Sequence, residues 1–116
     1  GGRVVPQDLG GPRHPRTAIG QRADGVRVLL TCDGRARESL GLSVGELAHL
    51  LRGLRCVDAL NLDGGGSTTL WVRDEPEGGV ANCPCDDKRF DHAGERAVSN
   101  ALLLLARDIL ELDEDE

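Results

Sequence analysis

The feature that most constrains the fold is a run of three glycines at positions 64–66, inside the sequence NLDGGGSTT. An apolar, strand-like run over residues 56–62 leads to Asp63. The three glycines follow Asp63, and three residues with hydroxyl side chains come after them. Consecutive glycines cost backbone entropy, so a fold keeps them where the main chain needs φ > 0 or approaches another group closely. The motif alone leaves two interpretations open: a site for an anionic or polyhydroxylated ligand beside Asp63, or a tight β-hairpin turn.

Sequence patterns on the N-terminal side of the glycines predict two strands and a helix. The alternation in residues 17–22 and 26–32 predicts a pair of strands joined by a turn at Asp24-Gly25. Ser43 followed three residues later by Glu46 predicts a capping box and a helix over residues 44–52. An apolar stripe at helical spacing supports this helix: Leu47, Leu50, Leu51 and Leu54.

Three further runs predict strands. Residues 56–62 are apolar enough for a central strand, and residues 68–72 are β-branched. Residues 98–106 predict the last strand, although their Ala and Leu content also allows a helix. The sum is an α+β fold, a mostly antiparallel sheet with one helix packed on a face, in the order β-β-α-β-β-β. Residues 1–15 are expected to be irregular, residues 16–107 to form the domain, and residues 108–116 to form an acidic tail.

Charge and composition narrow the classes of partner. The net charge is −6, but six of the 20 acidic residues lie in residues 108–116, so the body is neutral. A neutral body without a basic stripe excludes nucleic acid as the expected partner. Trp71 and Phe90 are the only aromatic residues, which argues against a stacking platform. No run of the sequence approaches the roughly 18 apolar residues of a membrane span.

The four cysteines predict no metal site. Cys32 and Cys56 sit in apolar strand runs and are expected to pack as small hydrophobic residues. Cys83 and Cys85 lie one residue apart in a polar loop, which is not the two-residue gap of common zinc knuckles, and no second pair follows. A disulfide from this loop to a missing segment or to another chain is the stronger expectation. We expect no cofactor.

Five motifs together identify a family. They are PRTAIG (residues 15–20), DGR (33–35), SVGELA (43–48), the glycine motif, and ERAVSNAL (95–102). In this order and at these spacings they resemble the phosphodiester glycosidase family, over about residues 13–105. The resemblance implies a hydrolase of sugar 1-phosphodiesters of the N-acetylglucosamine type, and it favours the secretory pathway or the extracellular space. The family domain is longer, so the chain is expected to match its C-terminal part.

The resemblance and the chemistry of the side chains together give a set of candidate site residues. Breaking a glycosidic bond needs a carboxyl group near the anomeric carbon, and a phosphate needs hydrogen-bond donors. Asp63 is the expected catalytic carboxylate, and Glu95 is the candidate for the second, with an exposed strand-edge acid as its alternative. Arg16 and Arg96 are the expected phosphate partners, because a guanidinium is a bidentate fork of donors. The remaining expected binding residues are Thr17, Gly64, Gly65, Gly66, Ser67, Thr68 and Asn100.

Two functions from different classes remain open at this stage. The first is a hydrolase acting on a small-molecule or glycan substrate. The second is a non-catalytic module that binds a glycan or a phosphate, or a half-domain that needs a missing N-terminal segment or a second copy of itself.

Overall fold

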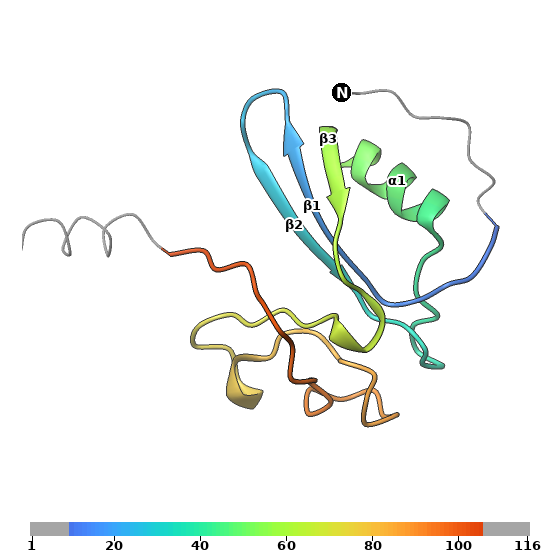
Figure 1. Ribbon diagram of the computed structural model, residues 1–116, viewed down its shortest axis with the longest axis vertical. Helices are drawn as coiled ribbons and strands as arrows, with labels where there is room; N and C mark the ends of the chain where they lie inside the picture. Colours follow the sequence, from blue (N-terminus) through green and yellow to red (C-terminus); the bar gives the residue numbers. More distant parts are fainter. Residues whose placement is uncertain (1–9, 106–116) are drawn as a thin grey trace, which may run out of the picture.

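The computed structural model describes residues 10–105, in which one antiparallel sheet carries a helix on one face (Figure 1). The strands are β1 (Arg16–Arg22), β2 (Arg27–Cys32) and β3 (Cys56–Asn61), in the sheet order β2-β1-β3. Helix α1 (Val44–Gly53) precedes β3, and two short 3-10 turns follow it, η1 (Gly65–Ser67) and η2 (Glu77–Gly79). The α+β class predicted from the sequence is confirmed.

The first two strands form the hairpin that their alternation predicted. Arg16 pairs with Cys32 and Gln21 pairs with Arg27, in antiparallel register. The connecting turn is closed by the N–H of Arg22, which donates to the carbonyl of Val26 at 2.8 Å. The Asp24-Gly25 pair lies in this turn, so its turn chemistry located the hairpin correctly.

The helix begins at the capping box that the sequence predicted. The N–H of Glu46 donates to the Ser43 hydroxyl at 3.2 Å, and the N–H of Ser43 donates back to the Glu46 carboxylate at 3.0 Å. The guanidinium of Arg13 contacts the same carboxylate at 2.9 and 3.0 Å. These bonds, that of Arg13 first, lower the pKa of Glu46 to about 2. The helix start is thereby joined to the segment that leads into β1.

A small core holds the helix against the sheet. Ala18 of β1, Leu47 and Leu51 are buried together, and the partly buried Leu30, Leu42 and Cys56 pack around them. On the opposite face of the sheet, one apolar residue from each strand lies side by side, with Ile19 between Leu29 and Leu60. No described residue buries these three side chains fully, and 60% of Leu60 is exposed. Within residues 10–105, no helix is long and apolar enough to cross a membrane.

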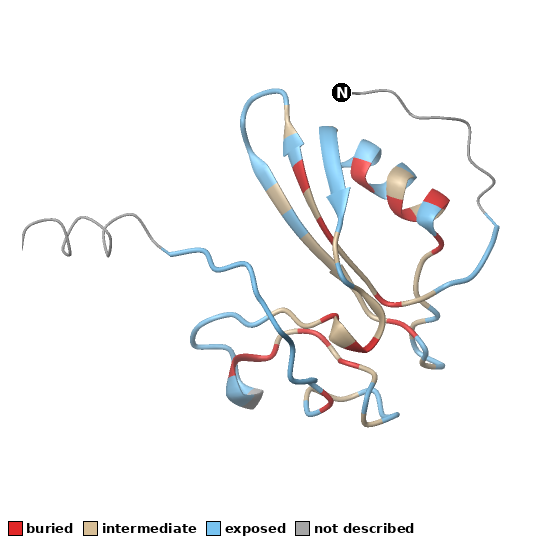
Figure 2. Cartoon of the chain, in the orientation of Figure 1, coloured by how far each residue is buried: buried red, intermediate tan, exposed pale blue. Residues whose placement is uncertain are grey.

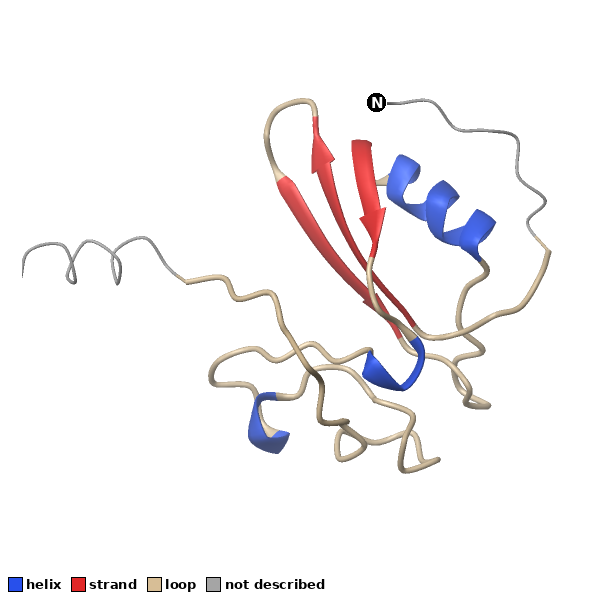
Figure 3. Cartoon of the chain, viewed as in Figure 1, coloured by secondary structure: helices blue, strands red, loops and turns tan. Residues whose placement is uncertain are grey.

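The position of β3 differs from the prediction. The apolar run was expected to be the central strand, but β1 is central and β3 lies at one edge of the sheet. The reason is that the two later runs, which were expected to extend the sheet, form no strands among the described residues (Figure 3).

The prediction of a strand over residues 68–72 is wrong, because a side chain replaces the backbone partner. The side-chain oxygen of Asn82 accepts from the N–H of Leu70 at 2.8 Å, and its amide nitrogen donates to the carbonyl of Thr68 at 2.8 Å. Regular pairing is reduced to one isolated bridge between Trp71 and Val80. A β-branched sequence thus runs extended without joining the sheet.

The prediction of a last strand is also wrong for residues 98–105. This segment is exposed along its whole length, and 79% of Leu103 is accessible (Figure 2). It runs away from the sheet, so no strand lies beside it to share backbone hydrogen bonds (Figure 1). Residue 106 lies outside the described residues, as do the acidic tail and most of the N-terminal segment that was expected to be irregular.

Candidate functional site

The glycine loop lies where β3 ends and β1 begins. Gly65 has a φ of +59°, in the left-handed region that favours glycine. Its N–H donates to the carbonyl of Pro15 at 2.9 Å, and just before the loop the N–H of Leu62 donates to the carbonyl of Thr17 at 2.8 Å. The loop is a 3-10 turn, and no strand follows it within residues 10–105, so in this part of the chain the β-hairpin interpretation is excluded.

Part of the backbone of this loop is already used inside the fold. The N–H of Ser67 donates to Gly64, and the N–H of Thr68 donates to Gly65, both at 3.1 Å. The N–H groups of Gly64 and Gly66 have no acceptor among the described residues. Gly66 is buried, so the N–H of Gly64 is the amide of the loop that an anion can reach.

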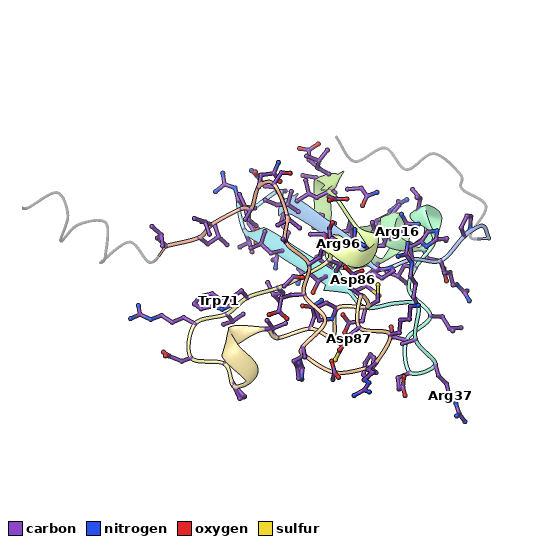
Figure 4. All side chains as sticks on the ribbon, turned by 60° about the horizontal axis from the view of Figure 1, so that its bottom comes forward. Arg16, Arg37, Trp71, Asp86, Asp87 and Arg96 are labelled. Atoms are coloured by element: carbon purple, nitrogen blue, oxygen red, sulfur yellow. The ribbon has the colours of Figure 1, made fainter. Side chains whose placement is uncertain are left out.

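One ion pair lies directly over Gly66. The guanidinium of Arg96 donates to both carboxylate oxygens of Asp86, at 2.7 and 2.8 Å, and Figure 4 shows the two side chains meeting. A Cβ on Gly66 would overlap both groups. These bonds lower the pKa of Asp86 and raise the pKa of Arg96 from their ordinary values. The absence of a side chain at position 66 is what allows the pair to sit there.

A second guanidinium lies over Gly65. The nearest Arg35 nitrogen is 3.1 Å from the position that a Cβ on Gly65 would occupy. Arg35 reaches the Nδ1 of His14 at 3.4 Å and the Sγ of Cys85 at 3.9 Å. Sequence reasoning did not assign Arg35 to the site. Its signal was present in the DGR motif, where it is the only basic residue.

Asp63 is exposed and lies between the end of β3 and the glycine loop. The hydrogen bonds that Arg96 donates to Asp86 are the main cause of the raised pKa of Arg96, and the charge of Asp63 adds to it. Asp63 therefore lies close enough to Arg96 to act on it electrostatically. Asp86, which sequence reasoning also missed, is the second carboxylate that the structure brings to the loop.

A buried side-chain network holds the long loop after residue 80 in place. Asn82 is 8% exposed, and its amide nitrogen donates to the Asp33 carboxylate at 3.0 Å. The N–H of Cys83 donates to both oxygens of Asp33, each at 3.0 Å. Asp33 therefore has a structural role. Its hydrogen bonds join the turn that carries Arg35 to the loop that carries Asp86.

Within this loop, His92 and an acidic pair add local order. The Nδ1 of His92 lies 2.7 Å from the carbonyl of Asn82, and because a carbonyl only accepts, this nitrogen carries the proton. A hydrogen bond between Asp87 and Asp91 raises the pKa of Asp87 and lowers the pKa of Asp91. Burial, with the charge of Asp33, raises the pKa of the Cys83 thiol.

Three residues predicted to bind substrate make internal contacts. The guanidinium of Arg16 donates to the carbonyl of Leu42 at 2.9 Å and reaches that of Pro12 at 3.4 Å. The hydroxyls of Thr17 and Thr68 are hydrogen-bonded to each other at 3.2 Å, and Thr68 is only 1% exposed. In these positions, Arg16 ties the entry of β1 to residue 42, and the threonine pair fixes the end of the glycine loop against β1.

The remaining predicted residues lie around the loop or beyond it. Ser67 is half-buried in the 3-10 turn, whereas Glu95 and Asn100 are exposed. Glu95 is the sequence neighbour of Arg96, and Asn100 lies on the exposed segment of residues 98–105. Their roles at the site stay predictions.

The cysteines of the described part are all free thiols, and its His, Cys, Asp and Glu side chains form no group of three that could hold a metal ion. Cys56 packs against the core, as expected for a small hydrophobic residue.

A comparison with protein families identifies a match over most of the chain. The family model described as phosphodiester glycosidase matches residues 1–105. The chain belongs to the phosphodiester glycosidase family.

Individual relatives match over shorter stretches. An uncharacterized protein of the SPbeta prophage in Bacillus subtilis (strain 168) is 46% identical over 60 residues, which is 52% of this chain and 9% of that protein. The N-acetylglucosamine-1-phosphodiester alpha-N-acetylglucosaminidases of Mus musculus and Homo sapiens are each 41% identical over 71 residues, which is 61% of this chain and 13% of each enzyme. This member of the family thus spans a small part of the length of its curated relatives.

A solved structure is also similar to this chain. The crystal structure of a protein from Burkholderia pseudomallei K96243 superposes with a TM-score of 0.59 at 37% sequence identity, covering 69% of this chain and 15% of that one. The chain therefore matches a small part of that larger protein.

Proposed function

We propose that the chain forms part of a hydrolase that cleaves a sugar 1-phosphodiester of the N-acetylglucosamine type, between the anomeric carbon and the phosphate oxygen. One observation carries the proposal: the exposed carboxylate of Asp63 lies beside a glycine loop that is covered by the guanidinium groups of Arg35 and Arg96. Family membership and the names of the mouse and human relatives support the choice of sugar.

The proposed reaction needs negative charge near the anomeric carbon and positive charge near the phosphate. Cleavage of the bond from the anomeric carbon to oxygen passes through an oxocarbenium-like state, whose positive charge a carboxylate stabilises. Asp63 supplies this carboxylate. Water supplies the new hydroxyl group of the sugar and a proton to the solution, and a phosphomonoester leaves. The amide of Gly64 and the guanidinium groups receive its negative charge.

The second carboxylate of the proposal has two candidates. Glu95 is the one that the sequence suggested, and it is exposed next to Arg96. Asp86 is the one that hydrogen bonds hold over Gly66. We keep Glu95 as the proposed residue and Asp86 as its alternative. Arg16, Thr17, Ser67, Thr68 and Asn100 complete the proposed binding set.

A non-catalytic role is the second candidate. The chain spans only 13% of the mouse and human enzymes, and Asp86 already neutralises one of the two guanidinium groups over the loop. A module with this geometry could bind a sugar phosphate without turning it over, or could need a further segment or a second copy to complete the site.

The two candidates differ in turnover. We would measure the release of N-acetylglucosamine from its methyl 1-phosphodiester by this chain and by a longer natural form that contains it. We would also measure the binding of N-acetylglucosamine 1-phosphate to both. A hydrolase releases free sugar with both proteins. Binding without release by either protein would assign the site to the non-catalytic class.

A further inference from the structure

Two guanidinium groups cover two neighbouring glycines, but their partners differ. Arg96, over Gly66, makes a bidentate ion pair with Asp86 at 2.7 and 2.8 Å. Arg35, over Gly65, contacts only the neutral ring nitrogen of His14 at 3.4 Å and the sulfur of Cys85 at 3.9 Å. No ion pair of Arg35 is found within the described part of the chain. The positive charge of Arg96 is therefore compensated at contact distance, and that of Arg35 is not.

The contacts of Arg35 are of a kind that an anion displaces readily. A guanidinium forms its strongest hydrogen bonds with charged oxygens in bidentate geometry. Imidazole nitrogen and sulfur are weaker partners, and both distances here are at the long end of the range for hydrogen bonds. Because Arg35 donates to the Nδ1 of His14, this contact uses the neutral ring. A phosphate above Gly65 would exchange two weak contacts for a strong one.

The backbone holds Arg35 in this position. It has a φ of +54°, which is uncommon for a residue with a side chain. Just before it, Asp33 is fixed by Asn82 and Cys83. Just after it, the Ser39 hydroxyl donates to the carbonyl of Asp33 at 2.7 Å. The turn is thus tied down on both sides, and Arg35 is presented over the loop by the scaffold.

We propose that Arg35 is the residue that anchors the anionic group of the ligand, at a subsite formed by its guanidinium, the N–H of Gly64 and the neighbouring side chains of His14 and Cys85. The ligand chemistry is a phosphate ester, and the inference rests on the proposed function for the identity of the attached sugar. Arg96 then serves to hold Asp86 over the loop.

The chain provides a matched control for this subsite. Arg37 lies two residues further on, is exposed, and reaches away from the glycine loop (Figure 4). Substituting Gln at either position removes one positive charge from the same turn, but only Arg35→Gln removes the guanidinium over Gly65.

The test is equilibrium binding of N-acetylglucosamine 1-phosphate, measured by calorimetry at fixed ionic strength for the unmodified chain, Arg35→Gln, Arg35→Lys and Arg37→Gln. Arg35→Gln should weaken binding by about 10- to 100-fold, the usual effect of losing a charged hydrogen-bond pair. The affinity of Arg35→Lys should lie between those of Arg35→Gln and the unmodified chain. Arg37→Gln should bind as tightly as the unmodified chain does. Uncharged N-acetylglucosamine should show no difference between the variants.

A second readout keeps the proposal testable if Arg35→Gln fails to fold. In the unmodified chain, titration with the sugar phosphate should shift the NMR signals of the Gly64 amide and of the Arg35 Nε. Unchanged signals, equal losses in Arg35→Gln and Arg37→Gln, or no binding by the unmodified chain would overturn the proposal. Arg35-dependent binding without turnover would leave the subsite standing and remove the hydrolase. Normal turnover in Arg35→Gln would remove the subsite and leave the hydrolase standing.

Discussion

The side-chain amide of Asn82 donates a 3.0 Å hydrogen bond to the carboxylate of Asp33, 49 residues earlier in the chain. The same amide group also satisfies the N–H of Leu70 and the carbonyl of Thr68. One buried side chain therefore joins the turn that carries Arg35, the chain that leaves the glycine loop, and the loop that carries Asp86. The geometry of the candidate site depends on this residue, although Asn82 itself makes no contact with the glycines.

Asn82→Ala should destabilise the fold. The substitution leaves the N–H of Leu70 and part of the Asp33 carboxylate without partners, and unsatisfied buried groups cost about 1–3 kcal/mol each. Urea denaturation should show a loss of at least that size. Asn100→Ala is the matched control, because Asn100 is exposed on residues 98–105. Equal stability of the two variants would mean that Asn82 does not hold the loops.

Gly65→Ala should lower the free energy of unfolding by about 1–2 kcal/mol, because the left-handed conformation at φ +59° is strained for any residue with a Cβ. Gly53→Ala should cause no loss, since Gly53 ends the helix and a Cβ there meets nothing within 4 Å. Thermal melting of both variants tests the pair. Gly65→Ala should also weaken binding of a sugar phosphate, because the new methyl group meets Arg35. If both variants have the same melting temperature, the conformation of Gly65 is not required by the fold.

The stability of the chain should depend on pH through Glu46. Its folded-state pKa, about 2, lies below the ordinary value of 4.5, because Arg13 and the helix N-terminus stabilise the charged carboxylate. A lowered pKa stabilises the fold above pH 4.5, and this contribution disappears as the pH falls towards 2. Glu46→Gln keeps a side chain that can cap the helix but removes the charge. Its melting temperature should fall below that of the unmodified chain at pH 7, and the difference should vanish near pH 2.

Glu38→Gln is the control for this pH profile, since Glu38 is exposed and removal of its charge leaves Arg13 and the capping box intact. It should show no comparable pH-dependent difference. A Glu46→Gln profile parallel to that of the unmodified chain would contradict the role assigned to the Arg13 contact.

The parts of the fold that local sequence determines were predictable. The hairpin follows from alternation around Asp24-Gly25, and the helix follows from the Ser43–Glu46 capping box. The later extended runs were not predictable as non-strands. Residues 68–72 have strand-like composition, but their backbone partner is the side chain of Asn82, which no sequence period reveals.

The candidate site was predictable in part for the same reason. The position of Asp63 beside the glycines follows from residues adjacent in sequence. Arg35 and Asp86 reach the loop from turns about 30 residues before it and 20 after it, and only the folded chain shows that they meet there. The contacts of Arg16 with backbone carbonyls were likewise invisible, because Leu42 lies 26 residues away in the sequence.

The central claim is that Asp63 acts at the anomeric carbon of a sugar phosphodiester. The most direct measurement is the rate of release of N-acetylglucosamine from its methyl 1-phosphodiester by the unmodified chain, Asp63→Asn and the control Asp74→Asn. Asp74 lies in an exposed loop, and its φ of +68° suits asparagine. Asp63→Asn should lose about 100-fold or more in kcat with an unchanged melting temperature, and Asp74→Asn should retain full activity. Release at an unchanged rate by folded Asp63→Asn would contradict the claim.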